Sequence, residues 1–245
     1  MPAETRSLQD TVVAITGATA GIGAATARLL VEAGARVALG GRRTERLDAL
    51  VAELGPENAV AVTCDVSRPA DNAALVAAAV DRWGKLDSVV PNAGMGLYGS
   101  ILDHADERVA EMMDTNYAGT VWTVRAAVPE MLRTTGGGDI VIVASVAGLR
   151  GGGDEAVYAG TKFAQVGLAG ALDRELSAKG IRVTAVCPAG VDTEFALGTG
   201  RTPGSPVLET YLRPEDVAFA VVTVLAQPRR LRTTLWSLWS MGQQS

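Results

Sequence analysis

Histidine and cysteine are scarce in this sequence, and each shortage narrows the chemistry that the chain can perform. His104 is the single histidine, which leaves too few imidazoles for a zinc site or a Ser-His-Asp triad; we expect it to be structural or exposed, and we expect no metal. The two cysteines, Cys64 and Cys187, are far apart, lack CxxC spacing and each end a β-rich run. We therefore expect reduced, buried thiols in a cytoplasmic protein rather than a disulfide or a redox pair.

Long apolar runs and clustered positive charge are also missing. The longest apolar runs, such as residues 73–80, are far shorter than the roughly 20 residues that cross a bilayer. The first ten residues are polar and contain no secretory apolar region. The net charge is −5 and the arginines are mixed with acids, which disfavours nucleic acid and membrane surfaces as partners. We expect a small-molecule partner.

Enough apolar residues are present for one full core. The chain has 245 residues, of which 48% are hydrophobic and 20% charged, and this composition predicts a single globular domain over residues 1–245. Runs rich in Val, Ile and Ala predict buried strands at 11–16, 36–40, 59–63, 86–90, 139–144 and 181–186. Helical spacing occurs at 22–33, 44–54, 69–83, 105–132 with a break near Thr115, 156–179 and from about 214. This alternation predicts an α/β fold with a doubly wound parallel sheet, whose ligands bind beyond the carboxyl ends of the strands.

A glycine-rich turn, TGATAGIG, follows the first expected strand and runs directly into a helix. Gly17, Gly21 and Gly23 allow a tight turn and a close approach of phosphate groups to the backbone. The free N–H groups of the helix that begins at Ile22 then offer a pyrophosphate site. The spacing is GxxxGxG rather than GxGxxG, and the alternative is a turn that is merely tight.

The second expected strand ends in LGGRR, which bears on the choice of cofactor. An acidic residue at this point favours NAD, whereas an arginine favours NADP. Gly41 stands where an acid would lie, and Arg42 and Arg43 follow it. Arg42 is the first candidate for the 2′-phosphate, with Arg43 assisting. The alternative is that both arginines only decorate the next helix together with Arg46.

With these features the sequence resembles the short-chain dehydrogenase/reductase family. The matching pieces, in the family's order, are TGATAGIG (16–23), CDV (64–66), NAG (92–94), Asn116 in TNYAG, Ser145, YAGTK (158–162) and CPAGVDT (187–193). They cover nearly the whole chain. The resemblance implies a single Rossmann-like domain with a seven-stranded parallel sheet, a seventh strand near 232–238, and assembly into homodimers or homotetramers.

The resemblance also implies how NADP would be held. By analogy Asp65 contacts the adenine, residues 92–94 line the adenosine side, and Val191 and Thr193 hold the nicotinamide carboxamide. The cofactor-binding residues expected from the motifs are Gly17, Thr19, Gly21, Ile22, Gly23, Arg42, Arg43, Asp65, Val66, Asn92, Ala93, Gly94, Tyr158, Lys162, Pro188, Gly190, Val191 and Thr193. Pro91, Thr161 and Ala189 depart from the family's common residues, and Ala20 is not basic. Arg42 therefore carries the NADP inference.

Four polar residues are the candidates for catalysis: Asn116, Ser145, Tyr158 and Lys162. Tyr158 and Lys162 would lie one helical turn apart on the same face. Free tyrosine titrates near pH 10, and a nearby ammonium together with a positively charged nicotinamide would lower its pKa, so that Tyr158 can act as the acid and base. Ser145 is expected to donate a hydrogen bond to the substrate oxygen, because no histidine can activate it as a nucleophile. By resemblance Asn116 would hold a water that relays protons to Lys162; its alternative role is a polar helix break.

The expected substrate pocket lies after the fourth, fifth and sixth strands. A segment rich in Gly and Pro, GTGRTPGSP at 198–206, belongs to a substrate loop at about 194–212 and is either a mobile lid or a plain surface loop. Arg150 could face an anionic group or simply be solvated. The apolar residues expected in the pocket are Met95, Leu97, Tyr98, Leu149 and Phe195.

The predicted activity is an NADPH-dependent oxidoreductase that reduces a ketone or aldehyde to an alcohol, or catalyses the reverse. Alternatives within the enzyme class are a 3-oxoacyl-thioester reductase and a dehydrogenase of small hydroxy acids or secondary alcohols. A different class is a nucleotide-sensing protein without catalysis, which should have lost one of the four catalytic candidates; none is lost. Small residues on the helix at 156–179 and two tryptophans, Trp236 and Trp239, indicate either self-association or monomer core.

Overall fold

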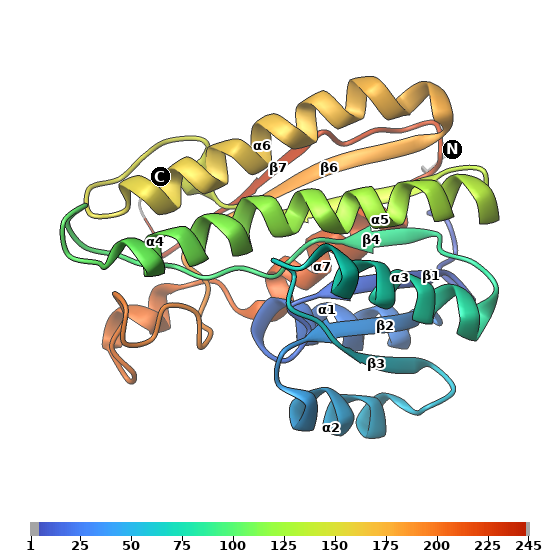
Figure 1. Ribbon diagram of the computed structural model, residues 1–245, viewed down its shortest axis with the longest axis horizontal. Helices are drawn as coiled ribbons and strands as arrows, with labels where there is room; N and C mark the ends of the chain where they lie inside the picture. The colour runs from blue at the N-terminus through green and yellow to red at the C-terminus, as the bar shows by residue number, and fades with distance from the viewer. Residues whose placement is uncertain (1–4, 244–245) are drawn as a thin grey trace.

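A seven-stranded, wholly parallel sheet forms the centre of the molecule, as the sequence predicts. The computed structural model describes residues 5–243, and its strand order is β3-β2-β1-β4-β5-β6-β7 (Figure 1). The strands are β1 (Val12–Thr16), β2 (Arg36–Gly41), β3 (Ala59–Thr63), β4 (Ser88–Val90), β5 (Gly138–Val143), β6 (Ile181–Pro188) and β7 (Leu235–Leu238). The chain reverses its order between β1 and β4, which is where a sheet of this kind opens a crevice for a ligand.

Helices cover both faces of the sheet. They are α1 (Gly21–Glu32), α2 (Thr44–Leu54), α3 (Pro69–Trp83), α4 (Asp106–Met113), α5 (Gly119–Thr134), α6 (Ala156–Leu176) and α7 (Pro214–Leu225). Alternate residues of β1 enter two separate cores: Val13 and Ile15 pack with α1, α2 and α7, whereas Val12 and Ala14 pack with α3, α5 and α6. Because both faces of each inner strand are buried, the strands read as continuous apolar runs. The doubly wound α/β prediction is confirmed.

The expected break near Thr115 is a change of helix type rather than a gap. Between α4 and α5 the chain forms η1 (Asp114–Ala118), a π-helical turn that contains Asn116. Such a turn widens the helix locally, and it is found mostly where a side chain or carbonyl is re-aimed at a functional site. A sequence pattern shows only the loss of the helical period and cannot distinguish these cases.

The cysteines and the histidine lie at structural positions. Cys64 and Cys187 are free and buried, as expected. His104 contacts the carbonyl of Tyr98 through Nε2 at 3.1 Å and has a structural position. Within residues 5–243 there is no cluster of metal-ligating side chains, and no helix there is long and apolar enough to span a membrane.

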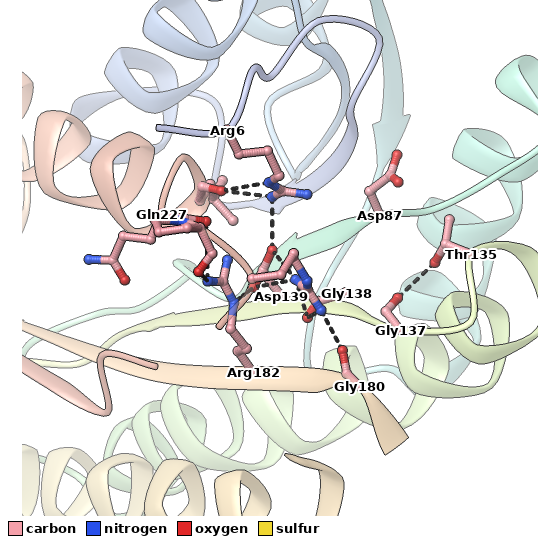
Figure 2. Close-up of polar contacts among 12 residues, drawn as sticks. Arg6, Asp87, Thr135, Gly137, Gly138, Asp139, Gly180, Arg182 and Gln227 are labelled. Atoms are coloured by element: carbon pink, nitrogen blue, oxygen red, sulfur yellow. Dashed lines mark hydrogen bonds and ion pairs between the residues drawn. The ribbon is translucent and has the colours of Figure 1, made fainter. Parts of the chain in front are cut away.

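A buried carboxylate anchors the amino end of the sheet. Asp139, near the start of β5, is 2% exposed at its side chain and pairs with Arg6 at 3.0 Å, Arg182 at 2.5 Å and Arg229 at 3.0 Å (Figure 2). Arg182 also donates to the carbonyls of Gln227, Pro228 and Leu231. One carboxylate thus ties the N-terminal segment, β6 and the connection from α7 to β7 to β5.

Replacing this carboxylate should be costly, because three guanidinium groups converge on it. Asp139→Asn is expected to lower the free energy of unfolding by about 3–5 kcal/mol, since it leaves the buried Arg182, whose side chain is 7% exposed, without its counter-charge. The matched control is Glu53→Gln, which removes an exposed pair with Arg28 (side chains 48% and 49% exposed) and should cost below about 1 kcal/mol. Urea unfolding measures both, and equal losses would contradict the anchoring role of Asp139.

Candidate active site

A single long cleft runs along the carboxyl ends of the strands. Its volume is about 1290 Å³, and its wall includes residues that follow β1, β2, β3, β4, β5 and β6. Of the cofactor and catalytic residues expected from the sequence, Gly23 and Asn116 lie behind the wall and the others form part of it. The sequence motifs, which are spread from Gly17 to Thr193, therefore meet in one cavity.

The glycine-rich turn has no room for larger residues. Gly17 and Gly21 have φ angles of +67° and +53°, which favour glycine. A Cβ at Gly17 would lie 2.8 Å from the Cα of Ala93, and a Cβ at Gly23 would lie 2.4 Å from the carbonyl oxygen of Gly17. Gly23 therefore acts from beneath the turn, by letting α1 approach β1, rather than by lining the cleft.

The amino end of α1 is left open to a ligand. Its N-cap residue is Ala20, which makes no side-chain cap, and its first turn contains no acid. The helix thus presents uncapped N–H groups and the positive end of its dipole to the cleft, and both favour a negatively charged group. These features fit the pyrophosphate of a dinucleotide cofactor.

Asn92 joins the ends of β1 and β4. Its backbone N–H donates to Thr16 Oγ1 at 3.0 Å, and its side-chain amide donates to the carbonyls of Thr16 and Gly17 at 2.9 and 3.2 Å. The side chain therefore shapes the glycine-rich turn, while the chain at 92–94 contributes to the cleft wall.

Arg42 and Arg43 lie in the same wall but have different partners. The Arg42 side chain is 64% exposed and lies 3.5 Å from Glu111 Oε1. Arg43 donates to Thr19 Oγ1 at 2.6 and 3.1 Å and to Glu194 at 2.8 Å. Burial raises the pKa of Asp65, but hydrogen bonds from Ser67 and the charge of Arg42 outweigh it and lower that pKa. Arg42 thus faces the Asp65 side of the cleft, and Arg43 faces the glycine-rich turn.

The three candidates for proton chemistry meet at the ends of β5 and β6. Ser145 follows β5; its Oγ accepts a hydrogen bond from the Ala147 N–H at 3.1 Å and lies 3.4 Å from the carbonyl of Pro188. Tyr158 and Lys162 lie on the first turns of α6, and Lys162 Nζ is 5.7 Å from the centre of the Tyr158 ring. The expected one-turn spacing holds.

Burial disfavours the charged forms of both Tyr158 and Lys162. It raises the pKa of Tyr158 above the ordinary value near 10; hydrogen bonding with Ser145 and the charge of Arg201 act in the opposite direction. Burial lowers the pKa of Lys162 from 10.5 to about 8. In the protein alone the phenolate is therefore unfavourable, and the reduction in tyrosine pKa expected from the neighbouring lysine does not prevail over burial.

Asn116 is connected to Lys162 through Gln165, a residue that was not predicted from the sequence. Its side chain is held by the backbone of Met95 and by Thr161 Oγ1. The carbonyl of Asn116 accepts from Gln165 Nε2 at 2.7 Å, and Gln165 Oε1 accepts from Lys162 Nζ at 2.9 Å. Lys162 also donates to the carbonyl of Val143 at 3.3 Å. Gln165 thus connects the Asn116 carbonyl to the Lys162 ammonium through two hydrogen bonds.

Gln165 carried a signal in the sequence. It lies three residues after Lys162, on the same helical face, and it is a polar residue in an otherwise small and apolar stretch. Its exposed fraction of 1% and its additional bond to Thr120 show that the amide is fully engaged.

Aromatic side chains form the substrate end of the cleft. The Tyr158 ring lies 5.4 Å from that of Tyr98 and 5.8 Å from that of Phe195. Met95 also lines the cleft, as expected. Leu97 does not, because it is buried in the small core beneath Tyr158.

Three apolar residues near the cleft, Leu149, Trp236 and Trp239, have different surroundings. Leu149 is 39% exposed to solvent and lies outside the cleft wall. Trp236 packs against the core, whereas Trp239 lines the cleft, with the Arg150 guanidinium 4.8 Å from its ring centre. Whether either tryptophan also takes part in self-association stays a prediction.

The expected substrate loop covers this end of the cleft. Thr199 links it to the segment after β4: its Oγ1 donates to the Gly96 carbonyl at 2.8 Å, and its carbonyl accepts from the Tyr98 N–H at 2.9 Å. Arg201, which the sequence reading did not single out, also lines the cleft.

The chain matches a known family model and curated relatives over most of its length. The model described as short chain dehydrogenase matches residues 11–202. An uncharacterized oxidoreductase of Staphylococcus aureus (strain USA300) is 34% identical over 224 residues, which cover 91% of this chain and 94% of that protein. One from Staphylococcus haemolyticus (strain JCSC1435) is 34% identical over 221 residues, with 90% and 93% covered.

Solved structures with the same fold contain nicotinamide cofactors. An alcohol dehydrogenase from the archaeon Thermococcus sibiricus, complexed with 5-hydroxy-NADP, has a TM-score of 0.87 and 31% identity, and the match covers 97% of this chain and 99% of that one. A closed form of serine dehydrogenase complexed with NADP+ has a TM-score of 0.89 and 31% identity, with 96% and 97% covered. A 3-ketoacyl-(acyl-carrier-protein) reductase from Brucella melitensis, complexed with NADH, has a TM-score of 0.84 and 28% identity, with 96% and 99% covered. The chain belongs to the short-chain dehydrogenase family and is an NAD(P)-dependent oxidoreductase that acts on CH–OH and C=O groups.

Proposed function

We propose that this enzyme reduces a ketone or aldehyde to the corresponding alcohol with NADPH, and that Tyr158 supplies the proton. The observation that carries the proposal is the convergence, in one cleft, of an uncapped helix terminus, two arginines after β2, and the Ser145, Tyr158 and Lys162 side chains. The cofactor would supply the hydride, and the protein would supply orientation and the proton.

The proton donor in this proposal is the Tyr158 hydroxyl. When a carbonyl carbon gains a hydride, negative charge develops on its oxygen, and a neighbouring O–H can neutralise that charge. Because burial raises the pKa of Tyr158, the residue remains protonated at neutral pH and is ready to donate. Ser145, which lies at the end of β5, would donate a second hydrogen bond to the same oxygen and hold the carbonyl in place.

Lys162 would assist after Tyr158 has given up its proton. The phenolate that remains is stabilised by an adjacent ammonium, and the lowered pKa of about 8 means that Lys162 is largely charged at neutral pH. Its Nζ is held by Gln165 and Val143.

NADP is the proposed cofactor because Arg42 and Arg43 are positioned to bind a 2′-phosphate while Gly41 offers no acid to a 2′-hydroxyl. Two of the three similar structures are complexed with NADP or a derivative and one with NADH. Thr193 and Val191 of the cleft wall remain the proposed contacts for the carboxamide.

Self-association remains a prediction. The outer face of α6 carries the small residues that allow close helix packing, and its Phe163 side chain is 47% exposed. Gly160 and Gly167 have open space where a Cβ would stand, so this face could accept another helix.

Replacing the proposed acid tests the assignment directly. Tyr158→Phe keeps the ring packed against Tyr98 and Phe195 but removes the proton, so kcat for NADPH-dependent reduction across a panel of ketones and aldehydes should fall by at least about 100-fold. NADPH binding, followed by cofactor fluorescence, should stay within about threefold of the unmodified enzyme. Tyr117→Phe, at an exposed position outside the cleft, serves as the control. A Tyr158→Phe enzyme with most of its activity would rule out the assignment, and a wild-type enzyme inactive on the whole panel would favour a nucleotide-sensing role.

The cofactor preference depends on Arg42. Arg42→Ala should weaken NADP binding roughly tenfold to 100-fold, the range expected for loss of a charged hydrogen-bonding partner, and should leave NAD binding nearly unchanged. Arg133→Ala is the charge control because Arg133 is similarly exposed, at 61%, on the distant α5. Calorimetric titration with both nucleotides measures the effect, and equal NAD and NADP affinities unaffected by the mutation would end the NADP proposal.

Burial of Lys162 should make stability depend on pH in a defined direction. Between pH 8 and 10.5 the unfolded chain binds the proton more tightly than the folded protein, so the Lys162 contribution to stability rises with pH across this window. Relative to Lys162→Met, the wild-type protein should therefore gain up to about 3 kcal/mol on going from pH 7 to above pH 10. Urea unfolding at several pH values measures this gain. Lys179→Met, at an exposed position, should show no such trend, and a pH-independent difference for Lys162→Met would show that the ammonium is not desolvated.

A further inference from the structure

Arg201 occupies a fixed position in the substrate end of the cleft. Its backbone closes a turn with Ala196 and Gly198. Its side-chain Nη1 donates to the carbonyl of Val191 at 2.7 Å, which ties the substrate loop to the chain just after β6. The guanidinium is therefore held in place before any ligand binds.

One edge of this guanidinium is free. Within residues 5–243, neither Nε nor Nη2 of Arg201 has a hydrogen-bond partner, and no carboxylate lies within 4.0 Å of the group. These two nitrogens form the edge that binds a carboxylate side-on with two parallel hydrogen bonds. Arg28 uses the same edge in this protein: its Nε and Nη2 donate to the two oxygens of Glu53 at 2.6 and 2.8 Å.

Two aromatic rings flank the Arg201 guanidinium. Its central carbon lies 5.6 Å from the centre of the Phe195 ring and 5.2 Å from that of Tyr211. This packing partly removes the cation from water without neutralising it, which favours a partner that approaches in the plane of the group. A planar carboxylate meets this requirement.

The cation also lies near the reacting groups. Phe195, which contacts Arg201, has its ring 5.8 Å from the Tyr158 ring. The charge of Arg201 is among the influences that lower the pKa values of Tyr158 and Tyr98, both of which burial raises. The Arg201 guanidinium and the Tyr158 ring thus both contact the Phe195 side chain.

Three other charged groups of the cleft wall differ from Arg201 in their surroundings. Glu194 is held by Arg43 and Arg46, and Glu155 accepts from the Gly152 N–H at 2.8 Å. Arg150 lies over Trp239 and is exposed.

We propose that Arg201 binds a carboxylate of the substrate, so that the preferred substrates are short oxo acids or, in the oxidative direction, the corresponding hydroxy acids. The proposal rests on the proposed reductase function and narrows it. Arg201 becomes a specificity-determining residue, and the side-on edge opposite its bond to Val191 becomes the carboxylate site.

The first experiment compares a carboxylate substrate with its neutral methyl ester. The kcat/KM of the wild-type enzyme with NADPH should be at least about tenfold higher for acetoacetate than for methyl acetoacetate, and the difference should lie mainly in KM. Butyrate should inhibit competitively, whereas butyramide, which has the same shape and no charge, should inhibit at least about tenfold more weakly. Equal constants for the charged and neutral members of both pairs would overturn the proposal.

The second experiment changes the residue. Arg201→Met should raise KM for acetoacetate roughly tenfold to 100-fold and leave KM for methyl acetoacetate within about threefold, which also shows that the variant is folded. Arg201→Lys should recover part of the loss, because it keeps the charge but not the planar edge. Arg133→Met removes the same charge at an exposed position outside the cleft and should affect both substrates by less than about threefold. Equal losses on both substrates for Arg201→Met would identify Arg201 as merely structural.

The outcomes separate this inference from the reductase proposal on which it rests. Reduction of neutral ketones or aldehydes without a preference for the acid would overturn the carboxylate site and leave the reductase intact. Stronger competitive inhibition by inorganic phosphate than by butyrate would assign the site to a phosphate-bearing substrate and overturn the carboxylate. Absence of NADPH oxidation with any carbonyl would overturn both.

Discussion

The candidate active site depends on an ammonium that is withdrawn from water. Lys162 is 4% exposed, and its charge is tolerated because acceptors reach it from β5, through the Val143 carbonyl, and from α6, through Gln165. Gln165 is fixed in turn by the carbonyl of Asn116 in the π-helical turn and by Thr120 at the start of α5. A strand end, two helices and an irregular turn must therefore all be in register before this one side chain can carry a charge.

β5 is constrained by charge at both of its ends, and the two constraints complement each other. At its amino end, Asp139 holds three arginines from separate parts of the chain. Toward its carboxyl end, Val143 accepts from Lys162, and Ser145 lies two residues further along the chain. Because the strand is buried between β4 and β6, an anchor at one end limits sliding or tilting at the other. The Asp139 cluster thus supports the position of Ser145 from the opposite edge of the sheet.

The fold was predictable because its determinants are local in the sequence. Buried parallel strands read as apolar runs, glycines end the helices, and the turn at Gly17 and Gly21 requires positive φ angles. Tyr158 and Lys162 were also identifiable, because one helical turn separates them. The motif residues were expected to meet in one cleft, because the carboxyl ends of parallel strands share an edge of the sheet.

What the sequence did not reveal depends on contacts between distant segments. Whether Gln165 faces Lys162 or solvent is decided by the rotation of α6 against η1, and whether Leu149 lines the cleft is decided by the path of the loop after β5. The pKa of Tyr158 was also not predictable from the sequence. The neighbouring ammonium follows from the spacing of Tyr158 and Lys162, but the burial that opposes its effect on the pKa does not. The sign of an electrostatic effect can be read from residue types, whereas its outcome requires the packing around them.

The residues of the proposed reaction and those of the proposed substrate selectivity lie in different parts of the fold. The proposed proton-transfer residues are held by strand ends and helix interiors, where hydrogen bonding fixes each side chain. The substrate end is formed by Tyr98, Phe195, Arg201 and Tyr211, from loops that meet through contacts such as the two hydrogen bonds of Thr199. These residues lie on loops that follow the strands, and loops tolerate change more readily than the strands and helices that hold Lys162 and Ser145. Selectivity for a carboxylate can therefore reside in a single loop arginine on a scaffold that otherwise specifies only carbonyl and alcohol chemistry.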